Sequence, residues 1–225
     1  MIYHVDTGLI FDKFKENSEC PLCAIQSIVE EQFLHEFLND AVMEDSTREK
    51  VNKHGFCSVH FDKLFFRPNK LSVALQIQTR TDFLNKIIDD ASSAKDAKKQ
   101  AERLDNALSS CIICDYTNKS MEKYYKTIAR LFSKDKEFIK LFYTSKGFCL
   151  NHYSELLKYC SNAGSFKNEY AKALTTVEKR NFERIKEEIN RFCNKHDYRN
   201  ANMPLGSAET ALPRMREKLY GKKED

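Results

Sequence analysis

The chain has 225 residues, 31% of them charged and 41% hydrophobic, and its formal net charge is only +4. This length suffices to bury a hydrophobic core, and the small charge, with acids and bases intermixed, argues against nucleic acid as the partner. No apolar segment follows Met1 and no run approaches about eighteen apolar residues, so we expect neither secretion nor membrane insertion and place the protein in the cytoplasm.

The low content of chain-breaking residues predicts the fold class. The chain has 6 glycines and 4 prolines, and long stretches carry none. Sandwiches and barrels need many turns, so this composition favours helices. We therefore expect an all-α protein.

Helical spacing of apolar residues and capping residues define elements in chain order. Pro21 suits the first turn of a helix and Gly55 suits the residue that ends one. The polar segment 91–99 can be a linker or an exposed helix. In the first part of the chain we expect helices at about 9–14, 21–38, 45–54, from Cys57 onward, and 71–90.

The second part follows the same plan. An apolar stripe from Phe166 to Phe192 predicts one long helix that packs across the core, with Cys193 continuing the stripe. A tail follows Asp197, with a short helix interrupted by Pro213. Here we expect helices at about 111–132, 134–143, from Cys149 onward, 165–196, and 207–220.

The pattern divides the chain into two related helical units and a tail. We expect a first unit at 1–92, a second unit with the long helix at 93–197, and a C-terminal tail at 198–225. The two units can also pack as a single domain.

Cysteines and histidines recur at matching positions in the two units. Cys20-Pro-Leu-Cys23 leads to Gly55-Phe-Cys57-Ser-Val-His60, and Cys111-Ile-Ile-Cys114 leads to Gly147-Phe-Cys149-Leu-Asn-His152. Three thiolates and one imidazole suit a tetrahedral zinc ion, so the pattern predicts two Cys3His sites with two Zn²⁺ per chain. The predicted metal ligands are Cys20, Cys23, Cys57, His60, Cys111, Cys114, Cys149 and His152.

Each cysteine pair falls at a predicted helix start. Residues i and i+3 then lie one turn apart on one face and can reach a common ion. Three thiolates and Zn²⁺ carry a net charge of minus one, which the positive ends of two helices would offset. A reducing cytoplasm also favours metal ligation over disulfides.

Several alternatives stay open at this stage. An iron–sulfur cluster or copper(I) also accepts such ligands, and the cysteines can be redox dithiols or plain core residues. Pairing of half-sites within each unit is the simpler arrangement. Crosswise pairing would join Cys20 and Cys23 to Cys149 and His152.

Other candidate residues have simpler explanations. Cys160 lies too far along its helix to share an ion with Cys149, and Cys193 is expected in the core. Glu31 and Glu122 are weaker candidates to accept a hydrogen bond from a ligand histidine. The tyrosines at 124 and 125 and the phenylalanines at 65 and 66 are interpreted as core aromatics.

No sequence signature of catalysis is present: the chain has no phosphate-binding glycine loop, no G-x-S-x-G and no H-E-x-x-H. A filled Cys3His shell leaves no open metal position for substrate. We expect a non-catalytic interaction or regulatory module that binds an unidentified protein partner. The alternatives are a thiol-redox or metal-responsive protein and an iron–sulfur electron carrier.

The repeated motifs, together with Asp197-Tyr-Arg-Asn200 and Ala211-Leu-Pro-Arg214, resemble an uncharacterised bacterial family of unknown function. The resemblance covers nearly the whole chain, and all eight cysteine and histidine positions of the family pattern are present. It implies the same ligand assignment and a bacterial cytoplasmic setting, without an activity.

Overall fold

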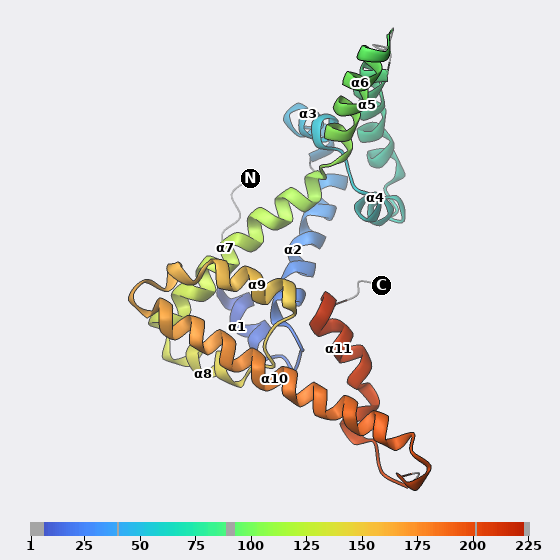
Figure 1. Ribbon diagram of the computed structural model, residues 1–225. Helices are drawn as coiled ribbons and strands as arrows, with labels where there is room; N and C mark the ends of the chain where they lie inside the picture. Colours follow the sequence, from blue (N-terminus) through green and yellow to red (C-terminus); the bar gives the residue numbers. More distant parts are fainter. Residues whose placement is uncertain (1–6, 40, 89–92, 201, 223–225) are drawn as a thin grey trace. The chain divides into compact units, whose positions relative to one another are not determined.

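A computed structural model describes the chain except for residues 1–6, 40, 89–92, 201 and 223–225. Within the described residues there are eleven α-helices and four short 3-10 helices, and no strand (Figure 1). The all-α prediction is confirmed. The α-helices are α1 (Thr7–Lys15), α2 (Pro21–Leu38), α3 (Asp45–His54), α4 (Ser58–Phe65), α5 (Lys70–Ile88), α6 (Ala94–Leu108), α7 (Ile112–Lys134), α8 (Lys136–Thr144), α9 (Leu150–Lys158), α10 (Lys167–Lys195) and α11 (Ala211–Tyr220). The 3-10 helices are η1 (Ala41–Met43), η2 (Cys160–Phe166), η3 (Tyr198–Asn200) and η4 (Gly206–Thr210).

The chain forms two compact units that differ from the expected consecutive ones. Unit 1 comprises residues 1–27 and 120–225, and unit 2 comprises residues 28–119. The divisions fall inside α2 and α7, so these two helices contribute residues to both units. Each unit therefore draws on both halves of the sequence pattern, whereas the expected boundaries lay near residues 92 and 197.

Unit 1 has a core of interlocking aromatic rings. Phe142 on α8 is fully buried, and its ring lies 5.3 Å from that of Phe132 on α7 and 5.7 Å from that of Tyr170 on α10. Phe14 on α1 packs 5.0 Å from Phe138 on α8. Such pairs add about 0.5–1.5 kcal/mol each beyond the apolar area that they bury. The core thus fixes the helices that surround the loop before α9.

Unit 2 has a smaller core that is supplemented by buried polar groups. Phe33 and Phe37 on α2 pack against the ring of Tyr116 on α7 at 5.2 and 5.9 Å. Gln76 on α5 is buried and donates to the Phe37 carbonyl at 2.5 Å. The buried guanidinium of Arg80 donates to the carbonyls of Asn52 and Ala107 and so joins α5 to α3 and α6.

Most predicted helices appear within a few residues of their expected ends. The open question about 91–99 is answered in part: α6 begins at Ala94 with Ser93 as its N-cap, whose hydroxyl accepts from the Asp96 N–H at 3.2 Å. Residues 91 and 92 lie outside the described part. Pro213 does not interrupt α11, because it is the third residue of that helix, where few backbone donors have intrahelical partners.

Two burial predictions are wrong. Cys193 is exposed, because the last buried apolar residue of the α10 stripe is Ile185 and the helix continues beyond the core. Phe65 and Phe66 are exposed at the end of α4, whereas Tyr124 and Tyr125 are buried as expected. Aromatic character alone did not distinguish these pairs.

Candidate metal centres

The structure gathers the eight predicted ligands into two groups that could each hold a metal ion. We call the group of Cys20, Cys23, Cys149 and His152 site 1, and the group of Cys57, His60, Cys111 and Cys114 site 2. Site 1 lies in unit 1 and site 2 lies in unit 2. The half-sites therefore pair crosswise, and the simpler pairing within each sequence unit is not adopted.

Two helix N-termini provide the ligands of each site. In site 1, Cys20 immediately precedes α2, Cys23 is the third residue of that helix, and Cys149 is the N-cap of α9. In site 2, the pair at 111 and 114 flanks the start of α7, and Cys57 is the N-cap of α4. No side chain caps α4 or α9, so their first N–H groups stay available to sulfur. The helix-start prediction thus agrees with the observed elements.

The distances between ligand atoms fit one tetrahedral ion in each site. Bonds of about 2.3 Å to sulfur and about 2.0–2.1 Å to nitrogen place two sulfurs about 3.8 Å apart, and sulfur and nitrogen about 3.6 Å apart. In site 1, Cys23 Sγ lies 3.7 Å from Cys149 Sγ. The Nδ1 of His152 lies 3.5, 3.5 and 3.2 Å from the sulfurs of Cys20, Cys23 and Cys149.

Site 2 has the same geometry. Cys57 Sγ lies 4.0 Å from Cys114 Sγ. The Nδ1 of His60 lies 3.2, 3.3 and 3.3 Å from the sulfurs of Cys57, Cys111 and Cys114. Within each site all four ligand atoms lie within 4.8 Å of one another. Both sets therefore have the dimensions of a mononuclear site.

Each ligand histidine has an oxygen partner behind it. Since Nδ1 faces the sulfurs, Nε2 donates outward, to Gln26 Oε1 at 2.8 Å from His152 and to Glu30 Oε1 at 3.0 Å from His60. Such partners fix the orientation and the tautomer of a metal-binding imidazole. The partner is a neutral amide in site 1 and a carboxylate in site 2, and both lie on α2.

The two glutamates proposed from the sequence have other partners. Glu31 accepts from Arg67 at 2.7 and 2.5 Å, and Glu122 accepts from Lys126 at 3.2 Å. The missed residues, Gln26 and Glu30, follow Cys23 at spacings of three and seven residues. This spacing places both residues on the same face of α2 as Cys23, so the sequence could have predicted them as partners of the ligand histidines.

In site 2 the histidine and one thiol shift each other's ionisation. Burial lowers the pKa of His60, but hydrogen bonds with Cys111 and Glu30 outweigh burial and raise it to about 10. Burial raises the pKa of Cys111, but hydrogen bonds from His60 and the backbone of Cys114 and Cys57 lower it to about 6. The protein groups alone therefore favour an imidazolium–thiolate pair, whose protons a divalent cation would displace.

In site 1 too, the pKa of one thiol is lowered and that of another is raised. Hydrogen bonds with Cys20 and Cys23 lower the pKa of the Cys149 thiol far below its ordinary value. Burial raises the pKa of Cys20. Burial lowers the pKa of His152, yet its hydrogen bonds with Cys149 and Cys23 raise it to about 9. In each site, hydrogen bonds thus lower the pKa of one thiol and favour its thiolate form.

A buried ion pair holds the loop that carries Cys149. Lys218 on α11 is 0% exposed, and its Nζ donates to the carbonyls of Lys146 and Phe148 and lies 3.4 Å from Glu178 Oε1. Glu178 on α10 also accepts from the Phe148 N–H at 2.8 Å. A Cβ on Gly147 would lie 2.6 Å from Glu178 Oε2, so only glycine fits this close approach.

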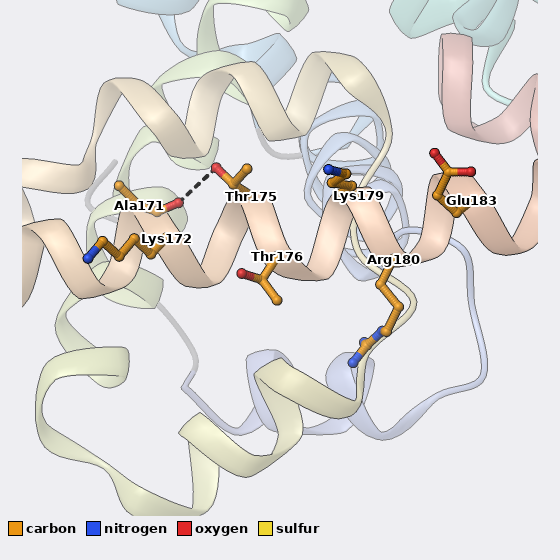
Figure 2. Close-up of a pocket in the computed structure, with 7 residues that line it drawn as sticks. All are labelled: Ala171, Lys172, Thr175, Thr176, Lys179, Arg180 and Glu183. Atoms are coloured by element: carbon orange, nitrogen blue, oxygen red, sulfur yellow. Dashed lines mark hydrogen bonds between the residues drawn. The ribbon is translucent and has the colours of Figure 1, made fainter.

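The surface of unit 1 has a hollow beside the candidate metal ligands of site 1 and another along α10. A small one of about 140 Å³ opens beside site 1, and Cys23, Cys149 and His152 are among its lining residues. A larger, shallow one of about 770 Å³ runs along α10 (Figure 2). All residues that line it belong to that helix, and Arg180 among them donates to the Tyr143 and Ser145 carbonyls. The hollow near the metal ligands is therefore the smaller one.

The C-terminal motif residues have structural contacts. Arg199 pairs with Asp197 at 2.6 Å, beside Tyr198, whose side chain is strongly exposed. Arg214 pairs with Glu188 on α10 and donates to the Ser207 carbonyl at 2.6 Å. The contacts of Arg214 tie η4 and α11 to α10.

Comparison with known proteins places the chain in a family without an assigned role. None of the helices in the described part of the chain is long and apolar enough to cross a membrane. No solved structure matches significantly. An "Uncharacterized 23.9 kDa protein in xynA 3'region" of Caldicellulosiruptor sp. (strain Rt8B.4) is 24% identical over 195 residues, covering 86% of this chain and 90% of the relative. Residues 1–225 match a family described as "Family of unknown function (DUF6062)", and the chain belongs to it.

Proposed function

We propose that this member of the DUF6062 family is a zinc protein in which two Cys3His sites stabilise an all-helical interaction or regulatory module. The observation that carries the proposal is the match between the ligand-atom distances of both sites and the edges of a tetrahedral zinc site. Four protein ligands fill the coordination shell, which is typical of a structural rather than a catalytic zinc ion.

The surroundings of the sites support this proposal. The net charge of minus one on a Zn²⁺ with three thiolates faces two helix N-termini in each site. Gln26 and Glu30 supply the oxygen that usually supports a zinc-bound imidazole. Thiolates in this number persist in a reducing compartment, so we propose a cytoplasmic location.

The ligand spacing favours zinc over the iron–sulfur alternative. A cluster distributes its ligands over more than one iron atom and therefore spreads them farther apart than a single ion does. All four ligand atoms of each site lie within 4.8 Å of one another. This separation suits one ion.

An exposed apolar edge of unit 2 supports a role in binding a protein partner. Phe66 is 78% exposed and Leu71 is 70% exposed, and the Phe66 ring lies 5.4 Å from that of the partly exposed Phe65. Large exposed apolar side chains close to one another are frequent at protein–protein contacts. We propose this end of α4 and the start of α5 as the partner surface.

Elemental analysis with an absorption spectrum tests the metal. The protein is purified anaerobically without a metal-affinity tag, and we expect two zinc ions per chain and no visible absorption. Iron with visible absorption would favour electron transfer, and a chain without metal would refute the proposal. Loss of one zinc ion together with stability in Cys111→Ser would support a structural site 2, whereas an intact reduced fold that loses only its response to oxidants would support a thiol switch.

A further inference from the structure

The two sites differ in the exposure of one ligand. Three of the four ligands are buried to the same degree in the two sites: the histidine is buried in both, the first cysteine of the pair (Cys20 or Cys111) is buried in both, and the second (Cys23 or Cys114) is half-buried in both. The exception is the N-cap cysteine: Cys149 is 1% exposed in site 1, whereas its counterpart Cys57 is half-buried in site 2. Cys149 in site 1 is therefore covered by other residues, whereas the corresponding Cys57 in site 2 is partly accessible to solvent.

The end of α11 provides this cover. A Cβ placed on Gly221 would lie 3.6 Å from Cys23 Sγ and 3.9 Å from Cys149 Sγ, so Gly221 lies next to both sulfurs. Tyr220, Gly221 and Lys222 line the small hollow beside the site. The Lys222 ammonium also suits the net negative charge of a zinc ion with three thiolates.

α11 is held in this position from several sides. Lys218 anchors it to the loop before Cys149 through the carbonyls of Lys146 and Phe148. Arg214 pairs with Glu188 on α10. Arg216 donates to the Gly221 carbonyl at 3.2 Å, which fixes the residue over the sulfurs.

The backbone of Gly221 makes the cover sensitive to substitution. Its φ of 85° and ψ of 172° lie in a region that is essentially restricted to glycine. A Cβ at this position would meet both sulfurs at ordinary contact distances, so a substitution acts through backbone strain, which favours a different path of the chain after α11.

We infer that residues Tyr220–Lys222 cap site 1 and that the two metal sites therefore have unequal roles, with site 1 locked and site 2 exchangeable. This inference rests on the proposed zinc sites. At site 2 an incoming ligand, such as a small thiol or a chelating carboxylate, can reach the zinc ion past the half-buried Cys57, whose counterpart Cys149 is buried, and replace its thiolate. The exchange is a ligand substitution in which zinc and sulfur keep their oxidation states: an incoming thiol loses its proton as its sulfur binds zinc, and the displaced cysteine thiolate takes up a proton.

The test measures zinc release from the full-length, zinc-loaded protein after addition of EDTA. We expect two phases of about equal amplitude, one zinc ion leaving quickly and one slowly. Alkylation with iodoacetamide during the fast phase, followed by peptide mapping, should modify Cys57 and Cys114 before Cys149. Alkylation of Cys149 as early as Cys57, or release of both ions at one rate, would refute the cap.

Gly221→Ala tests the cap directly. We expect the slow phase to become about tenfold or more faster, the factor that corresponds to strain in a glycine-only region, while the fast phase is unchanged. Gly206→Ala is the matched control, because Gly206 also has a positive φ of +54° but a Cβ there would meet no atom within 4 Å. A slow phase in Gly221→Ala equal to that of the control would overturn the inference.

Two truncated chains test the cap independently, in case the Gly221→Ala variant does not fold. Ending the chain after Tyr220 removes Gly221 and Lys222 from the cap but keeps α11, whereas ending it after Lys222 keeps the whole cap. Only the shorter chain should lose the slow phase. A full-length chain that holds no zinc would refute the proposed function, whereas two zinc ions with equal release rates would refute only the cap.

Discussion

Glu30 offers the sharpest test of how the protein supports a metal ligand. Its carboxylate accepts from His60 Nε2 at 3.0 Å and from Lys63 at 2.5 Å, and the side chain is buried. Glu30→Ala removes the acceptor that fixes the His60 ring. Loss of such a partner typically weakens metal binding about 10- to 100-fold, or about 1.4–2.7 kcal/mol.

The neighbouring glutamate provides the control. Glu31 lies on the same helix but pairs with Arg67 and does not contact a ligand, so Glu31→Ala should leave zinc affinity unchanged. Glu30→Gln should lose less than Glu30→Ala, because an amide oxygen can still accept from the imidazole, as Gln26 does at site 1. The three variants separate the loss of the hydrogen bond from a general loss of charge.

The assay is competition for zinc with a chromophoric chelator, fitted with two binding constants per chain. We expect Glu30→Ala to weaken the binding constant of site 2 only, with the constant of site 1 preserved. Equal affinities of the Glu30→Ala and Glu31→Ala variants would refute the assigned role of Glu30.

Three further results follow from the structure. Lys218→Met should lower the free energy of unfolding by about 3–5 kcal/mol, because it leaves the Glu178 carboxylate buried without its partner. Urea unfolding at constant free zinc measures this loss, and adding Glu178→Gln should restore part of it. A loss below about 1 kcal/mol would contradict the buried pair. A short bifunctional thiol reagent added to the metal-free protein should join Cys23 to Cys149 rather than to Cys57, the partner that pairing within one sequence repeat would require, as peptide mapping would show. Zinc affinity at site 2 should rise from about pH 6 to about pH 9, because the pKa of His60 is raised to about 10, burial raises the pKa of the Cys114 thiol, and binding must displace both protons. Calorimetry in buffers of different ionisation enthalpy counts the protons released, and an affinity independent of pH would contradict this assignment.

Local sequence signals predicted the helices well because each carries its own boundaries. Pro21 begins α2 and Gly55 follows α3, as their backbone preferences require. The two groups of candidate metal ligands were also recognisable, since cysteines spaced by three residues at a helix start can reach one ion. The partners Gln26 and Glu30 could have been read from the same helical face.

Burial and ligand pairing could not be read from local sequence. Phe65 and Phe66 belong to the same residue type as the core phenylalanines, yet they lie at the end of α4, where no described helix covers them completely. Pairing within or across the sequence repeats uses the same ligands at the same helix starts. Only the packing of the helices within each unit decides between the two arrangements.

Crosswise pairing changes what a bound metal ion does for stability. A site that bridges Cys23 and Cys149 closes a segment of 126 residues, whereas bridging Cys23 and Cys57 would close thirty-four. Loop-closure entropy grows with the logarithm of segment length, so the longer bridge removes about 1 kcal/mol more conformational freedom from the unfolded chain. Because each site takes ligands from both repeats, neither can assemble until both halves of the chain are present, and a metal ion bound there would stabilise contacts between segments far apart in sequence.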